Sequence, residues 1–248
     1  MNFENLTCER ADDVMTVTLN RPAKLNSLSL GLLQDLRHCA EVMQRDRALR
    51  AVLLTGSGRG FCAGADLTDP SSIPAPGQSM GQFMASRLRS EYNIVAALWC
   101  NLSVPLVVGL NGVAAGAGAS LALMGDVTVA ARSASLTFLF APKLGLAPDM
   151  GATHFLARRI GEARARYYAM TGAPIGAETA ERIGLLAECV DDEQLPARAA
   201  ALAGELAAAP REALVAVRGL MARACTSSLP EQLELEAEIT ATGEIFGT

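Results

Sequence analysis

Apolar and polar positions follow two different periods in the first part of the chain, and each period predicts a different element. Residues 14–19 alternate with a period of two, which is typical of a half-buried strand. The chain then turns at Asn20, Arg21 and Pro22. Apolar side chains next recur every three or four residues, as on one face of a helix, at Leu32, Leu33, Leu36, Ala40 and Met43. This segment therefore predicts a strand, a turn and an amphipathic helix.

Further short apolar runs predict additional strands. They cover residues 51–54, 105–110, 127–131 and 136–140. The first of these runs leads into a glycine-rich turn, and the second leads into a segment of glycine and alanine. Strands that alternate with turns and helices in this way predict an α/β fold.

The pattern changes near Gly151, where the chain becomes helical and rich in alanine. Breaks in this helical pattern fall at Gly161, Gly172, Gly184 and Pro210. We therefore predict a core domain over residues 1–190 and a C-terminal helical region over residues 191–248.

Composition and charge limit the class of protein. The chain has 248 residues, half of them hydrophobic, which is enough to bury a full core. A net charge of −5 gives no general attraction to nucleic acid or to anionic membranes, so we expect neither as a partner. Residues 92–125 carry no charge, but Pro105, Asn111 and several glycines interrupt them, so this stretch predicts protein core.

The cysteines and histidines limit the chemistry. The chain has six cysteines without a CxxC pair, and we expect reduced thiols, no disulfide and no structural zinc. The first residues do not resemble a signal peptide, so we expect a cytoplasmic protein. Only His38 and His154 are available, which argues against a histidine metal site or a Ser-His-Asp triad, and no metal is expected. Cys62 is expected to be a buried core thiol rather than a nucleophile.

Two segments of small residues are the strongest candidates for chemistry. Residues 61–67 read Phe-Cys-Ala-Gly-Ala-Asp-Leu, and residues 111–120 read Asn-Gly-Val-Ala-Ala-Gly-Ala-Gly-Ala-Ser. Each follows an apolar run, and each can bring bare backbone N–H groups against a ligand. Neither segment carries a complete P-loop or dinucleotide motif. Two such turns can face one carbonyl oxygen, although tight packing of a helix on a sheet is the simpler alternative for the second.

In their order and spacing, these two turns resemble the enoyl-CoA hydratase/isomerase (crotonase) family. The resemblance implies a ββα spiral core followed by a helical region that builds trimers, sometimes paired into hexamers. It also implies an acyl-CoA substrate, with CoA as part of the substrate and no separate cofactor. The oxyanion hole for the thioester would be formed by the backbone N–H groups of Ala65 and Ala117.

The resemblance also implies a binding site for the CoA portion. The residues that match the family's CoA-binding positions are Ala23, Lys24, Leu25, Ala63, Asp66, Leu67 and Gly116. Lys24 offers a positive charge to the phosphates of CoA. Residues 68–78 are rich in proline and serine and lack an apolar period, which predicts a mobile loop and a candidate substrate lid.

The proton-transfer residue distinguishes members of the family. Hydratases carry two glutamates around a water molecule, but this chain has Ser120 at the first position and Ala141, or Lys143 in a shifted register, at the second. Asp149 matches the single carboxylate of several isomerases, and its surroundings look most like those of ring-1,2-epoxyphenylacetyl-CoA isomerases. We therefore favour an acyl-CoA isomerase with Asp149 as the proton-shuttling base.

Other interpretations stay open at this point. Asp149 follows a proline and precedes a predicted helix, so it could act as a helix N-cap. Within the family, the chain could be a hydratase with substitute groups, or a dehalogenase or thioesterase with Asp149 as nucleophile. From a different class, it could bind acyl-CoA or RNA without catalysis.

Overall fold

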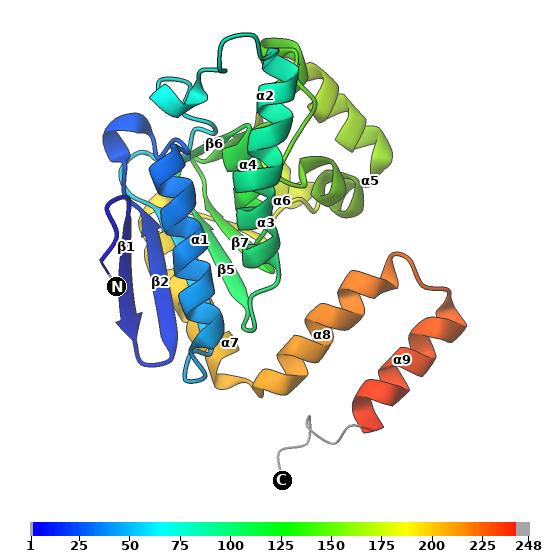
Figure 1. Cartoon of the computed structure of the whole chain (residues 1–248). Coiled ribbons are helices and arrows are strands. Elements are labelled where there is room, and N and C mark those ends of the chain that lie inside the picture. Colours follow the sequence, from blue (N-terminus) through cyan, green and yellow to red (C-terminus); the bar gives the residue numbers. More distant parts are fainter. Residues whose placement is uncertain (1, 242–248) are drawn as a thin grey trace.

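The computed structural model describes residues 2–241 and contains two β-sheets with helices packed around them (Figure 1). The six-stranded sheet has the order β1-β2-β3-β5-β7-β10. Its strands are β1 (Leu6–Ala11), β2 (Val14–Leu19), β3 (Ala51–Gly56), β5 (Leu106–Leu110), β7 (Val127–Ala131) and β10 (Glu188–Val190). The four-stranded sheet has the order β4-β6-β8-β9. Its strands are β4 (Gly60–Cys62), β6 (Val113–Ala115), β8 (Ser135–Thr137) and β9 (Ile175–Gly176).

Successive strands alternate between the two sheets, which gives the ββα spiral. Strands β3, β5 and β7 lie in the large sheet, and each is followed along the chain by a strand of the small sheet, β4, β6 or β8. Within each sheet these neighbours are parallel. The carboxyl ends of β4 and β6 therefore meet at one edge of the small sheet.

Helices cover both faces of the large sheet. The helices are α1 (Leu30–Arg45), α2 (Met80–Arg87), α3 (Asn93–Cys100), α4 (Ala117–Ala122), α5 (Ala152–Thr171), α6 (Ala177–Arg182), α7 (Leu195–Ala208), α8 (Arg211–Ala224) and α9 (Leu229–Ala241). A π-helical turn, Leu88–Tyr92, joins α2 to α3.

Alternate side chains of β3 show how the sheet is buried on both sides. Val52 and Leu54 belong to the main core, together with residues of α1 and α3 such as Trp99. Ala51 and Leu53 belong to a second cluster that includes Ala199 of α7. A strand with apolar side chains on both faces has no polar alternation, which explains the continuous apolar sequence of β3.

The C-terminal helices differ in their contact with the core. Helix α7 packs on the large sheet, whereas α8 and α9 contain no buried residue among those described. Arg218 ties α8 to the body by donating to the Cys100, Leu102 and Val104 carbonyl oxygens, and it pairs with the Asp126 carboxylate. The predicted helical region thus contains helices as far as residue 241, and residues 242–248 lie outside the described residues. The domain boundary at residue 190 stays a prediction.

Two predicted features need adjustment. The strand predicted over residues 136–140 is shorter, because β8 ends at Thr137 and the chain enters a π-helical turn over Phe140–Leu144. Pro142 lies in that turn and cannot donate to a β-ladder. Strand β1, antiparallel to β2 at the sheet edge, has no counterpart in the predicted elements. Within residues 2–241, no helix combines the length and apolar character needed to cross a membrane.

Candidate active site

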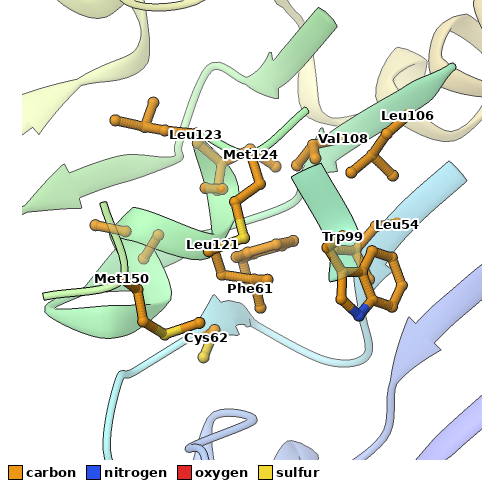
Figure 2. Packing of buried hydrophobic residues seen from close by; sticks show 14 of the residues in the cluster. Leu54, Phe61, Cys62, Trp99, Leu106, Val108, Leu121, Leu123, Met124 and Met150 are labelled. Carbon is orange, nitrogen blue, oxygen red and sulfur yellow. The ribbon is translucent and has the colours of Figure 1, made fainter. Parts of the chain in front are cut away.

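The two small-residue turns meet at the carboxyl ends of β4 and β6. The strands are paired in parallel, with Gly60 opposite Val113 and Cys62 opposite Ala114. Cys62 is fully buried, and it belongs to the core cluster that also holds Phe61 and Met150 (Figure 2). Burial raises the pKa of the Cys62 thiol to about 12, which is the behaviour of a core thiol and not of a nucleophile.

Glycine is required where the turns touch. A Cβ added to Gly64, at φ 88°, would lie 2.6 Å from the Ala115 carbonyl oxygen and 3.5 Å from the Ala117 nitrogen. A Cβ added to Gly118 would lie 2.1 Å from the Cys62 carbonyl oxygen. The first turn therefore lies directly against the second, and the Ala117 amide is part of the contact region.

We expect Gly118→Ala to be destabilising by roughly 1–3 kcal/mol and to impair activity, because its methyl group must push the two turns apart. Urea denaturation measures the free energy of unfolding. Gly204→Ala in α7 is the matched control, since a Cβ there meets nothing within 4 Å. A Gly118→Ala protein as stable as the control would contradict the close contact between the turns.

The Ala65 N–H is left free by the way its neighbours are paired. Leu28 donates its N–H to the Gly64 carbonyl oxygen at 2.7 Å, and its own carbonyl accepts from Asp66 N–H at 3.0 Å. In a parallel bridge of this kind, the N–H of the central residue, Ala65, points away from the partner strand. Within residues 2–241, nothing accepts a hydrogen bond from this N–H.

The Ala117 N–H is free because it starts a helix. Gly116 precedes α4 with φ 53° and ψ −128°, a conformation that a residue with a Cβ rarely adopts, and its N–H donates to the Thr137 carbonyl oxygen at 2.9 Å. The first N–H groups of a helix have no partner inside the helix. The two turns thus present one unpaired backbone donor each, from Ala65 and Ala117, across a contact only a few ångströms wide.

The predicted CoA-binding residues lie together beside the first turn. Ala63 donates its N–H to the Leu25 carbonyl oxygen at 2.9 Å, and Lys24 Nζ lies 3.5 Å from Thr68 Oγ1. Ala23 and Lys24 are exposed, and Leu67 is 71% exposed. An exposed cation and an exposed apolar side chain at one rim are consistent with a binding surface for a long ligand, and their contact with CoA stays a prediction.

Asp66 differs from this group, because its carboxylate is buried and fully engaged within the protein. Its Oδ1 accepts from the backbone N–H and the hydroxyl of Thr68, and its Oδ2 pairs with Arg21 at 2.9 Å. Burial alone would raise the pKa of Asp66, but the Thr68 hydrogen bonds and the Arg21 guanidinium lower it to about 2. Asp66 holds the turn in shape and leaves Ala65 exposed to a ligand.

Asp149 approaches the same region from the segment before α5. Ser120, one turn along α4 from Ala117, donates its hydroxyl to the Asp149 carbonyl oxygen at 3.0 Å. Met150 and Gly151 follow with φ 48° and 81°, so the chain changes direction immediately after Asp149. Of the Asp149 carboxylate, Oδ1 is buried and has no hydrogen-bond partner among the described residues. Burial raises the pKa of this carboxyl to about 6.

The helix-capping interpretation of Asp149 is wrong. Helix α5 begins at Ala152, its N-cap is Gly151, and no described side chain caps it. The two left-handed residues between Asp149 and the helix place the carboxylate outside capping position. A carboxylate oxygen that is buried without a partner, as Asp149 Oδ1 is, costs stability, and such groups are concentrated at functional sites.

Three supporting residues make contacts that the sequence pattern does not predict. Tyr92 is 4% exposed at the end of the π-helical turn, where burial and the nearby Asp149 charge raise its pKa to about 12. The Asn26 amide, fully buried, donates to the Ser57 and Gly60 carbonyl oxygens. Ser120 holds the Asp149 backbone. Of these features, the π-helical turn is of a kind that is common at functional sites. No pattern in the sequence predicts that turn.

A cavity of about 950 Å³ lies behind this region, between α3, α5 and α8. Met150 and Gly151 line it, but Ala65, Ala117 and Asp149 do not. The cavity therefore lies beside the candidate reacting centre, which the two free amides and the Asp149 carboxylate would form. Among residues 2–241, no cluster of three or more His, Cys, Asp or Glu side chains could hold a metal ion.

Comparison with known proteins agrees with this geometry. The family model described as "Enoyl-CoA hydratase/isomerase" matches residues 9–243. Two sheets in a ββα spiral, with two small-residue turns in contact, are typical of a crotonase-type protein. The chain belongs to the enoyl-CoA hydratase/isomerase family.

The names of the relatives include both isomerase and hydratase. The chain is 43% identical to the 1,2-epoxyphenylacetyl-CoA isomerase of Escherichia coli, over 91% of this chain and 84% of that protein. It is 37% identical to the "Probable enoyl-CoA hydratase" of Rhodobacter capsulatus, over 96% and 89%. The crystal structure of an enoyl-CoA hydratase from Bacillus anthracis matches with a TM-score of 0.88 and 30% identity, covering 99% of this chain and 92% of that one. These likenesses confirm the predicted crotonase-like fold and leave the reaction open.

Proposed function

We propose that this protein is an acyl-CoA isomerase that moves a double bond, or rearranges an unsaturated or ring-containing acyl group, through a thioester enolate. The observation that carries the proposal is the Asp149 carboxylate. Asp149 is half-buried, its Oδ1 atom is buried without a hydrogen-bond partner among the described residues, and its carbonyl oxygen is held by Ser120 of the helix that begins with the Ala117 donor. The identity to the Escherichia coli isomerase supports the same assignment.

In the proposed mechanism, the thioester carbonyl oxygen accepts hydrogen bonds from the Ala65 and Ala117 N–H groups. The Asp149 carboxylate removes a proton from the carbon next to that carbonyl, and the electron pair of the broken C–H bond moves onto the carbonyl oxygen as an enolate. The protonated carboxyl then returns the proton to another carbon of the acyl chain. One oxyanion-hole donor is worth roughly 3–4 kcal/mol in measured enzymes, and positioned proton transfer adds roughly 10²–10⁴-fold.

The surroundings of the site disfavour the two-glutamate hydration mechanism. The first glutamate position holds Ser120, which is fully buried and donates its hydroxyl to the Asp149 carbonyl oxygen. Ala141 and Lys143 are exposed and provide no carboxylate. Asp69 is a further carboxylate on the segment after the first turn, and it already accepts hydrogen bonds from the backbone N–H groups of Leu30 and Ser71. A second base that could activate water is therefore missing from these positions.

The proposal is tested with a panel of β,γ-unsaturated and ring-containing acyl-CoAs, and with the conjugated 2-enoyl-CoAs that hydratases use. We expect conjugation of the double bond, seen as increased thioester absorbance, and slow hydration of the 2-enoyl esters. Faster hydration than isomerisation would identify a hydratase instead. Tight binding of the esters without turnover of any would support a non-catalytic acyl-CoA-binding protein.

The isomerase rate should depend on pH with a midpoint near 6. Asp149 acts as a base only when it is ionised, so kcat/KM is expected to be constant above pH 7 and to fall about tenfold per unit below pH 6. The measurement is the initial rate at low substrate concentration between pH 4.5 and 8.5, with enzyme stability checked at each pH. A flat profile across this range would exclude Asp149 as the base.

A further inference from the structure

Cys8 and Cys39 form a close pair of thiols far from the candidate active site. Their Sγ atoms lie 3.7 Å apart, although the residues are 31 positions apart in the sequence. Cys8 is half-buried on the edge strand β1, and Cys39 is fully buried on α1. One member of the pair can therefore be reached from solvent, and the second lies directly behind it.

The backbone around the pair is held by contacts on both sides. Asn5 donates its backbone and side-chain N–H groups to Asp35 Oδ2 at 2.9 Å each, and the rings of Phe3 and His38 stack edge to face at 5.8 Å. Arg10 pairs with Asp46 just beyond the end of α1. These contacts hold β1 beside α1 and keep the two sulfur atoms near one another.

The two thiols differ in pKa and in their accessibility to solvent. The hydrogen bond with Cys39 lowers the pKa of Cys8. The same hydrogen bond and burial keep the pKa of Cys39 above its usual range. Cys8 is also the more accessible sulfur, since it is half-buried and Cys39 is fully buried, and Cys39 is placed to resolve a mixed disulfide on Cys8.

We propose that Cys8 and Cys39 are a modification site that forms a reversible intramolecular disulfide when the protein meets a small-molecule disulfide. The Cys8 thiolate attacks one sulfur of the oxidant, which releases one thiol and leaves a mixed disulfide on Cys8. Cys39 loses its proton and attacks Cys8 Sγ, which releases the second thiol. The protein loses two hydrogens and two electrons, and the oxidant gains them.

The new bond requires the sulfur atoms to approach from 3.7 Å to about 2.0 Å. Strand β1 pairs with only one neighbour, β2, and can shift more easily than a central strand. A disulfide between Cys8 and Cys39 would close a loop that contains Leu28. Leu28 pairs with Ala65 of the candidate active site. Oxidation would therefore restrain the segment that orients one amide donor, while leaving Asp149 outside the loop.

The test uses the full chain carrying Cys225→Ser, which removes the one cysteine that is exposed among the described residues and could link two molecules. Reduced protein is incubated with oxidised glutathione, blocked with N-ethylmaleimide, and mapped by mass spectrometry. We expect a peptide pair joined through Cys8 and Cys39. We also expect a melting temperature higher by roughly 5–15 °C, which dithiothreitol reverses.

Matched variants decide the assignment. Cys8→Ser should abolish both the linked peptide and the rise in melting temperature, whereas Cys189→Ser, at another half-buried cysteine, should retain both. Because Cys8 is half-buried, its replacement is expected to fold even if a Cys39 variant does not. Free, alkylated Cys8 and Cys39 after oxidation, or a stable glutathione adduct on Cys8 with Cys39 unpaired, would overturn the proposal.

Discussion

The Asp149→Asn variant is expected to lose isomerase turnover by roughly 10²–10⁴-fold with little change in substrate binding. The amide has nearly the same shape as the carboxylate but cannot accept and return a proton. The loss should therefore appear in kcat. Because the Ala65 and Ala117 donors are backbone groups on other segments, the thioester should still bind. Steady-state kinetics on the preferred substrate, with binding measured separately by calorimetry, checks both parts.

The same variant should be at least as stable as the parent protein above pH 6. The pKa of Asp149 is about 6 in the folded protein and 3.8 in the absence of its surroundings. Below pH 3.8 the carboxyl is protonated in both states and has no effect. As pH rises from 3.8 to 6, the unfolded state ionises first and up to roughly 2–3 kcal/mol of stability is lost. An asparagine avoids this loss, because it does not ionise.

Glu162→Gln is the matched control, since it makes the same chemical change on an exposed carboxylate of α5. It should leave kcat unchanged. Full activity of Asp149→Asn would remove Asp149 from the mechanism. Loss of activity together with loss of the folded state would instead show that Asp149 is required for stability and would leave its chemical role unsupported.

Ala117→Pro is expected to lower kcat by roughly 10²–10³-fold, since proline removes one oxyanion-hole donor without adding a charge. Ala117 is the first residue of α4, where proline is well tolerated because the N–H has no partner within the helix. Ala117 is buried and its nitrogen lies in the contact between the two turns, so circular dichroism and the melting temperature are measured first, and kcat is compared only if both match the parent protein. Kinetics with the substrate used for Asp149→Asn gives the size of the effect.

Ala117→Ser provides the comparison, because it changes the side chain and keeps the backbone N–H. We expect it to retain most of the activity. If proline and serine at this position reduce kcat equally while both proteins fold, the side chain and not the amide would be responsible. The proposed oxyanion hole would then be wrong at its second donor.

Periodicity predicts the α/β class and most long elements, because one apolar face repeated over many residues is a strong signal. The helix 30–45 and the strands at 14–19 and 51–56 are examples. It misses β4, β6, β9 and β10, which have only two or three residues each. Periodicity also misses β1. Most residues of this edge strand are exposed, so it lacks the alternation of apolar and polar residues that predicts a strand.

The candidate site divides in a similar way. The two turns can be found in the sequence as runs of small residues, and the resemblance to the enoyl-CoA hydratase/isomerase family selects Ala65 and Ala117 within them. The Ser120 hydrogen bond to Asp149 spans 29 positions and leaves none. The capping interpretation failed for a related reason. The left-handed conformation of Met150, which separates Asp149 from α5, is uncommon for a residue with a side chain and is fixed by packing in the core.

The two free donors belong to the main chain, and this has an evolutionary consequence. Every substitution at positions 65 and 117 except proline preserves an N–H group, provided that the glycines beside them keep the turns in place. In the proposed mechanism, stabilisation of the enolate is therefore robust to mutation, whereas the choice of reaction depends on the position of a carboxylate. A lineage with this architecture can exchange one acyl-CoA reaction for another through changes at a few side chains, without a period in which the core chemistry is lost.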